Sequence, residues 1–151
     1  MRKGSRLWIV IADGSRARIV APGDQPSAYK TVRVFDSPEA RLSAHALGES
    51  PPGRAQESAT SGRHAIESRS DPHEHAETAF LREVAAGIKA ADKEGAFDQL
   101  LIVAQPRVAA ALAENLPGSV KSKITAELAK DLTKTPDHQL APHLAAALPA
   151  S

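Results

Sequence analysis

The chain has 151 residues, of which 42% are hydrophobic and 25% charged, with a formal net charge of +1. This length suits a single domain with a sizeable core. The absence of cysteine excludes disulfides, cysteine nucleophiles and thiolate metal sites. No apolar run approaches the roughly 20 residues of a membrane span. We therefore expect a cytoplasmic protein that has neither a membrane nor DNA as its partner.

The stretch from Arg6 to Ala21 predicts a β-hairpin on which the rest of the chain is organised. Leu7 to Ala12 is apolar at every position, which is typical of a strand covered on both faces. Asp13-Gly14 is a strong hairpin signal. Arg16 and Arg18 alternate with apolar residues, so we expect one face of the second strand to be exposed.

A third strand and a long loop follow the hairpin. Residues 30–35 alternate polar with apolar side chains and extend an antiparallel meander. Residues 37–70 are rich in Pro, Gly, Ser and Ala and cannot bury enough surface to fold alone. This loop is either a disordered insertion or an ordered binding loop. Its basic and imidazole side chains are Arg41, Arg54, Arg63, Arg69, His45 and His64.

A long helix is predicted from Asp71 to about Glu94. Asp71 can cap the helix, Pro72 suits its first position and Glu74 completes a capping box. Gly95 predicts its end. The apolar stripe of the helix consists of Ala76, Phe80, Val84, Ile88 and Ala91.

The same helix start raises the question of a metal site. His73 and Glu77 lie one turn apart and could share an ion, but no third ligand is dictated by the spacing. The helix dipole already explains carboxylates in a first turn. We expect no metal site, with His73 and Glu77 as weak candidates.

The second half of the chain predicts a central strand between helices. Residues 100–104 form a solid apolar run, and Gln105-Pro106-Arg107 opens a helix that reaches Leu116. Residues 121–133 fit either a helix or a strand. A last helix is predicted from Pro136, and its inner face consists of Leu140, Leu144, Ala147 and Leu148.

This order of elements predicts one α/β domain over residues 1–151. Three antiparallel strands followed by crossover helices give a mixed five-stranded sheet of the ribonuclease-H-like kind. In that topology residues 121–133 serve better as a fifth strand than as a helix.

The sequence favours anion binding over catalysis. A nuclease of this fold needs carboxylates converging on metal ions, and Asp13, Asp98 and Asp131 form no persuasive cluster. Phosphate-loop and nucleophile-elbow motifs are absent, so we expect neither an enzyme nor a cofactor. The best anion site is Gln105-Pro106-Arg107 at the end of the central strand, unless Arg107 is simply solvated there. Because aromatic residues are few, RNA contacts would be to the backbone and salt-sensitive.

Several stretches together resemble the bacterial host attachment family, whose members are described as proteins required for attachment to host cells. The resemblance covers nearly the whole chain, and it lies in WIVIADGSRARIV, PPGR, RHAIE, SDPHEHAETAFLREVA, FDQLLIVAQPR and ELAKDLTK. That family is similar to the middle domain of archaeal and eukaryotic peptide-chain release factors. The resemblance implies a ribonuclease-H-like fold without nuclease activity and points to a role at the ribosome.

The positions that mark this family can each be assigned to a residue of this chain. Where members commonly have Leu-Gly and a further Arg after Pro-Arg, this chain has residues 108–113, VAAALA, which weakens a two-arginine anion clamp. The Gly-Gly-Gln of peptide release is absent, so peptidyl-tRNA hydrolysis is not predicted. The marked positions fall on Asp13, Arg18, Gly53, Arg54, His64, Asp71, Phe80, Pro106, Arg107, Lys130 and Asp131.

Three functional hypotheses remain open. The first is a non-enzymatic module that binds structured RNA or the ribosome. A second is a factor required, directly or indirectly, for adhesion to host cells. A third is a metal-dependent phosphoesterase that uses Asp13, His73 and Asp131. For the first hypothesis the expected contacts are Arg16, Arg18, Arg54, Arg63 and Arg107.

Overall fold

The protein, as a computed structural model, is described over residues 6–25, 28–42 and 72–148. Its centre is a five-stranded sheet of order β3-β2-β1-β4-β5. β1 pairs antiparallel with β2 and parallel with β4, and β4 pairs parallel with β5. The predicted mixed sheet is thus confirmed, including the fifth strand. The strands are β1 (Leu7–Ala12), β2 (Arg16–Pro22), β3 (Tyr29–Asp36), β4 (Gln99–Val103) and β5 (Ile124–Leu128).

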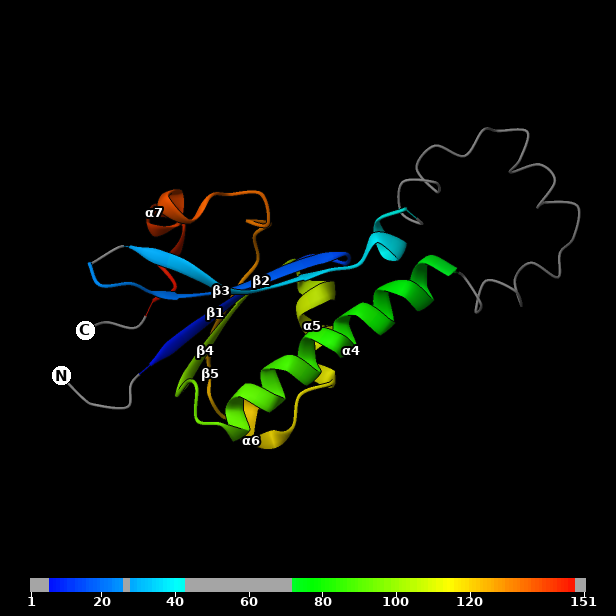
Figure 1. The fold of residues 1–151 in the computed structure, drawn as a ribbon, viewed down its shortest axis with the longest axis horizontal. Coiled ribbons are helices and arrows are strands. Elements are labelled where there is room, and N and C mark those ends of the chain that lie inside the picture. The colour runs from blue at the N-terminus through cyan, green and yellow to red at the C-terminus, as the bar shows by residue number, and fades with distance from the viewer. Residues whose placement is uncertain (1–5, 26–27, 43–71, 149–151) are drawn as a thin grey trace, which may run out of the picture.

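Strand β1 is buried on both faces because layers of chain cover the sheet on each side. Val10 belongs to the core beneath the helices α4 (Pro72–Lys93), α5 (Pro106–Glu114) and α6 (Gly118–Lys121). Ile9 and Ile11 belong to a second core on the opposite face. Figure 1 shows α4 and α5 on one side of the sheet and α7 (Leu140–Leu144) on the other. This arrangement explains why β1 is apolar at every position.

Helix α4 follows the predicted stripe closely. Phe80, Val84 and Ile88 are buried, and Gly95 adopts a φ of 72° just past the end of the helix. This left-handed conformation is the one that favours glycine as a helix stop. Asp71 and the side chain of His73 lie outside the described residues. No helix in the described ranges is long and apolar enough to cross a membrane.

The C-terminal segment departs from the single helix predicted from Pro136. It forms a short 3-10 turn, η2 (Asp137–Gln139), and then α7, which has only five residues. Pro142 accounts for the late start, because it has no N–H to donate to the carbonyl of His138 and is tolerated only in a first turn. The predicted inner face is confirmed, since Leu140 and Leu144 are buried.

Arg18 departs from the prediction of an exposed strand face. Its side chain is only 14% exposed, because residues 133–137 lie over it. The guanidinium donates hydrogen bonds to the backbone carbonyls of Thr133, at 2.8 Å, and of Thr135. Its Nε lies 3.4 Å from Oδ1 of Asp137. Asp137 also accepts hydrogen bonds from the N–H and hydroxyl of Thr31, both at 2.9 Å. Arg18 therefore fastens the C-terminal segment to the sheet.

The predicted loop also begins later than expected. Residues 38–42 are helical and follow Ser37, whose Oγ accepts a hydrogen bond from the N–H of Ala40 at 3.0 Å. This bond is the usual N-cap contact of a serine. Ala40 is fully buried, so the first turn of the predicted loop packs against the domain. Residues 43–71 lie outside the described ranges.

Candidate functional site

Three parallel strands end together at one edge of the sheet, which we call the carboxyl edge. Ile11 of β1 pairs with Val103 of β4, and Val103 pairs with Leu128 of β5. The residues that follow these strands therefore lie close together. They are Asp13 with its turn, Gln105-Pro106-Arg107, and Lys130-Asp131. The edge thus brings together the family-marked positions Asp13, Pro106, Arg107, Lys130 and Asp131.

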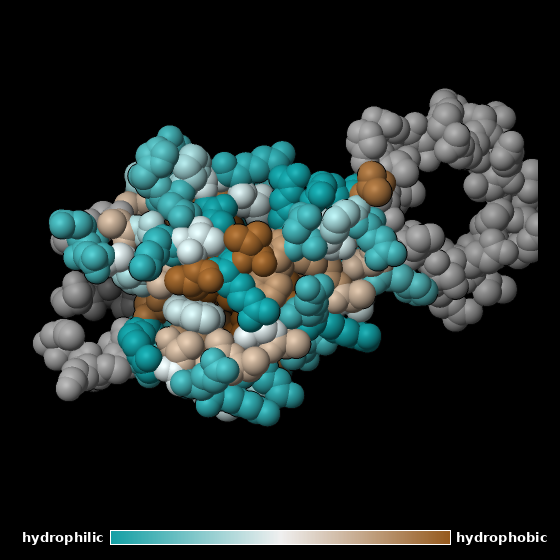
Figure 2. Space-filling model, in the orientation of Figure 1, coloured by the Kyte–Doolittle hydropathy of each residue, from teal (hydrophilic) through white to brown (hydrophobic). Residues whose placement is uncertain are grey.

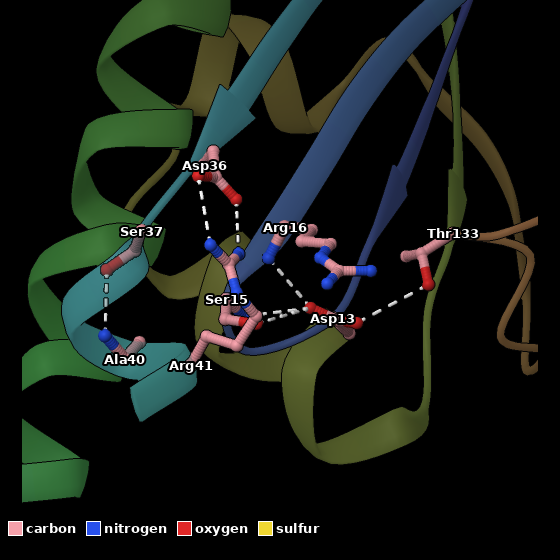
Figure 3. A network of polar contacts seen from close by, with 8 residues as sticks. All are labelled: Asp13, Ser15, Arg16, Asp36, Ser37, Ala40, Arg41 and Thr133. Atoms are coloured by element: carbon pink, nitrogen blue, oxygen red, sulfur yellow. Dashed lines mark hydrogen bonds and ion pairs between the residues drawn. The ribbon is translucent and has the colours of Figure 1, made fainter. Parts of the chain in front are cut away.

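Asp13 organises the turn between β1 and β2. Its N–H donates to the carbonyl of Arg16 at 2.8 Å, which closes a two-residue turn. Its Oδ1 accepts hydrogen bonds from the N–H groups of Ser15, at 2.8 Å, and of Arg16, at 2.7 Å. Its Oδ2 lies 3.4 Å from the hydroxyl of Thr133. Figure 3 marks this contact with a dashed line. The main role of Asp13 is therefore to stabilise the turn, and its side chain also contacts the segment that follows β5.

Asp131 is held by the same threonine. Its Oδ1 accepts hydrogen bonds from the hydroxyl of Thr133, at 2.6 Å, and from the Thr133 N–H, at 3.1 Å. The hydroxyl bond is the main cause that lowers the pKa of Asp131. Lys130 and Lys134 on either side are exposed. This loop keeps its carboxylate hydrogen-bonded within the loop and presents two cations to solvent.

Glu77 links α4 to the start of α5. Its side chain is 7% exposed, and its Oε2 accepts a hydrogen bond from Nη1 of Arg107 at 2.8 Å. Arg107 itself is 73% exposed, at the first turn of α5. Burying a carboxylate is costly unless it is paired, so this contact explains how Glu77 is tolerated inside. The predicted anion site at Arg107 thus already has one carboxylate neighbour from the protein itself.

Glu77 also explains the glycine of the turn. A Cβ placed on Gly14 would lie 2.9 Å from the Glu77 carboxylate, closer than real side chains approach. Among the described glycines, Gly95 has a positive φ and Gly14 does not. The close approach of Glu77, and not an unusual backbone conformation, therefore favours glycine at position 14.

The weak candidates for a metal site, which we did not expect to exist, are His73 and Glu77. Within the described ranges, no group of three or more His, Cys, Asp or Glu side chains could hold an ion. Glu77 faces Arg107, while the side chain of His73 is not described. The Glu77 carboxylate thus has an ion pair as its observed role.

The helical residues 38–42 complete the edge. The N–H of Ser37 donates to the carbonyl of Ser15 at 2.8 Å, and Arg41 pairs with Asp36 at 2.5 Å (Figure 3). The Arg41 contact lowers the pKa of Asp36. The Ser37 contact therefore ties this short helix to the turn between β1 and β2. The remaining predicted positions, Gly53, Arg54, Arg63, His64 and Asp71, lie outside the described residues.

Sequence reasoning missed some of the residues that build this edge. Thr133 joins Asp13 to Asp131, and the Asp-Leu-Thr spacing of residues 131–133 is the signal that could have indicated a local side-chain turn. Ser37-Pro38 carries the signature of a helix start inside the predicted loop. The contact of Glu77 with Arg107 joins residues 30 positions apart and has no local signal.

The chain matches the model of one known protein family over most of its length. Residues 8–144 match the model of a family described as "Protein required for attachment to host cells". None of the curated proteins compared matches the chain. This match agrees with the resemblance found in the sequence motifs.

A solved structure shares the fold. An archaeal translation termination factor, aRF1, superposes with a TM-score of 0.51 at 10% identity, covering 97% of this chain and 39% of its own. A second match is described as an archaeal protein, with a TM-score of 0.46, 10% identity, and coverage of 96% and 38%. This chain therefore spans about two fifths of the length of the structures that it matches. At such low identity the first likeness establishes the fold alone.

Proposed function

The chain belongs to the family of proteins required for attachment to host cells, and on this premise we propose that it is a non-catalytic module that binds RNA, with the ribosome as its partner. The carboxyl edge carries this proposal. There Asp13, Glu77 and Asp131 all accept hydrogen bonds from the protein, although Asp131 is also exposed. Lys130 is exposed, and Arg107 is 73% exposed although one of its donors is given to Glu77.

A surface of this kind suits phosphate groups. Exposed arginine and lysine side chains neutralise backbone phosphates and release counterions, which favours binding without base recognition. Arg107 retains donors beyond the one given to Glu77, and an arginine can bond a phosphate with two of them. Because the guanidinium of Arg18 is occupied by Thr133, Thr135 and Asp137, we do not retain it among the phosphate contacts. Arg54 and Arg63 stay predictions.

The shared fold supports the choice of partner. The solved structure with the TM-score of 0.51 is an archaeal translation termination factor, and this chain matches about two fifths of it. A module of the same fold with exposed cations at one sheet edge is suited to ribosomal RNA. We propose no chemical step, because Asp13 and Asp131 both contact the Thr133 hydroxyl. Phosphoesterase activity through Asp13, His73 and Asp131 remains the competing prediction, tested on phosphodiester substrates with Mg²⁺ or Mn²⁺.

Cosedimentation with purified bacterial ribosomes tests the proposal. The wild-type protein is expected in the ribosome pellet at low salt and to be partly released at moderate salt. The double variant Arg107→Ala/Lys130→Ala should lose most of the bound fraction at both salts. A matched control, Arg6→Ala/Lys93→Ala, removes the same charge at the other end of the sheet and should bind like the wild type. A wild-type protein that stays in the supernatant at both salts contradicts the proposal.

The description of the family favours a second candidate function, a factor required for attachment to host cells. Fractionation of cells that produce the protein separates the two candidates. Recovery with ribosomes supports the first candidate, whereas a pool exposed at the cell surface supports direct adhesion. An attachment defect in a deletion strain, restored by wild type but not by Arg107→Ala/Lys130→Ala, would instead make the role in attachment depend on the carboxyl edge.

A further inference from the structure

A shallow groove of about 190 Å³ lies beside the carboxyl edge, and we call it the β2–β3 groove. Its walls are mostly apolar, and Val34 on β3 is 67% exposed. Figure 2 shows apolar side chains on the face over β3, surrounded by hydrophilic surface. The principal lining residues are Ile11, Arg16, Arg18, Val34, Asp36 and Thr133.

The topology explains why this apolar surface is left open. The C-terminal segment buries Ile9 and Ile11 of β1 together with Leu101 and Val103 of β4. The C-terminal segment covers β2 only as far as Arg18. Val34 is the partner of Arg18 on the neighbouring edge strand, β3. The groove is therefore the margin of a covered sheet face, with Thr133 of the covering segment as one wall.

Two arginines give the groove its chemical character. Arg18 is a wall held in place by the Thr133 and Thr135 carbonyls and by Asp137, so its planar guanidinium is fixed before any ligand arrives. Arg16 is half-buried beside the turn of Asp13 and lies opposite Asp36, which also lines the groove. The ion pair of Asp36 is with Arg41, and none of the ion pairs found between described residues involves Arg16. A planar, apolar ligand with an adjacent negative charge matches this pair.

We propose that the β2–β3 groove receives one unstacked base of a single-stranded RNA segment, with a neighbouring phosphate on Arg16. This inference rests on the RNA binding proposed above and adds the form of RNA that is preferred. Bases splayed out of single strands and loops pack on guanidinium planes and apolar side chains, whereas duplex RNA keeps its bases stacked inside. Lys130 and Lys134 are exposed cations near Thr133, and they can neutralise phosphates of the RNA backbone on either side of the bound base.

The test compares binding of a short single-stranded RNA with a duplex of the same sequence, by fluorescence polarisation of the labelled RNA. The wild type is expected to bind the single strand at least about tenfold more tightly than the duplex. Val34→Asp should abolish this ratio and leave duplex affinity close to that of the matched control. That control is Val32→Asp, which places the same charge on the same strand at a residue that is also exposed, at 43%, but does not line the groove.

Each outcome separates this inference from the function on which it rests. Binding of neither RNA by the wild type contradicts RNA binding as such. Equal binding of single strand and duplex is consistent with RNA binding but contradicts the proposal that the β2–β3 groove receives an unstacked base. Equal loss in Val34→Asp and Val32→Asp also overturns it, because charge alone would then explain the effect. If Val34→Asp keeps the single-strand preference, the groove has another occupant, such as an apolar side chain of a protein, and the inference fails.

Discussion

The two ends of the sheet use ion pairs differently. At the end opposite the carboxyl edge, which we call the amino edge, Arg6 pairs with Asp98 at 3.2 Å, and Lys123 pairs with Asp92. Beside these pairs, Trp8 stacks on Phe97 with ring centroids 5.2 Å apart. Each of these cations is thus matched by a nearby carboxylate.

At the carboxyl edge the carboxylates are engaged and cations are left exposed. Asp13 and Asp131 are held by hydrogen bonds and Glu77 by Arg107, while Lys130 extends into solvent. The two cations proposed as phosphate contacts also differ from each other. Lys130 is exposed and belongs to none of the ion pairs found between described residues, whereas Arg107 pairs with Glu77 and is still 73% exposed.

Removing Arg18 should destabilise the protein most. Arg18→Ala leaves two carbonyls without their charged donor and the Asp137 carboxylate without its ion-pair partner, so we expect the free energy of unfolding to fall by about 2–3 kcal/mol. The same change at the amino edge, Arg6→Ala, removes an exposed pair and should cost less than about 1 kcal/mol. Urea unfolding followed by circular dichroism measures both. Equal losses would contradict the structural role of Arg18.

Filling the space at Gly14 should have an intermediate effect. The new Cβ of Gly14→Ala meets the end of the Glu77 side chain, which must move and disturb its contact with Arg107, so a loss of about 1 kcal/mol is expected. Gly118→Ala is the control, because a Cβ at that position meets nothing within 4 Å. Thermal unfolding should show a lower midpoint for Gly14→Ala alone. A Gly14→Ala protein as stable as the wild type would mean that Glu77 is not confined there.

Acidification should give the smallest effect, and it involves both edges. The Thr133 hydroxyl lowers the pKa of Asp131, and the N–H of Arg6 lowers the pKa of Asp98, each below its ordinary 3.8. Since these pKa values are lower in the folded state, the stabilisation is present above the unfolded pKa and is lost as pH falls through the folded pKa.

Substitution by asparagine isolates these two contributions. Asp131→Asn and Asp98→Asn should each lose stability less steeply than the wild type as pH falls from about 5 to about 2. Asp24→Asn, a change in the exposed turn after β2, serves as the control for removal of one charge. Urea midpoints measured at each pH provide the comparison. Curves for Asp131→Asn that parallel the wild type would show that the Thr133 contact adds no pH-dependent stability.

The sequence predicted the elements whose signals are local. The continuous apolar run of β1 and the capped, periodic α4 were predicted from residues 7–12 and 72–94, and the structure confirms them. Residues 121–133 matched two periodicities, and only the topology favoured the strand that is observed. At the carboxyl edge, parallel strand ends predicted that Arg107 would stand at the sheet margin.

What the sequence left out depends on contacts between distant residues. Arg18 alternates with apolar residues like a solvent-facing side chain, yet residues 133–137 cover it. Nothing near Glu77 in the sequence indicates Arg107 as its partner. The last helix was predicted too long because its apolar spacing outweighed the local effect of Pro142. Such contacts require the fold to be known first.

Amide chemical shifts of the protein titrated with a single-stranded RNA test the central claim most directly. We expect the shift changes to gather at the carboxyl edge, over residues 13–16 and 130–134, at Gln105 and Arg107, and at Val34. Residues 6–8, 96–99 and 121–123 of the amino edge should keep their shifts. Changes centred on the amino edge, or no changes under conditions in which the protein is folded, would contradict the account.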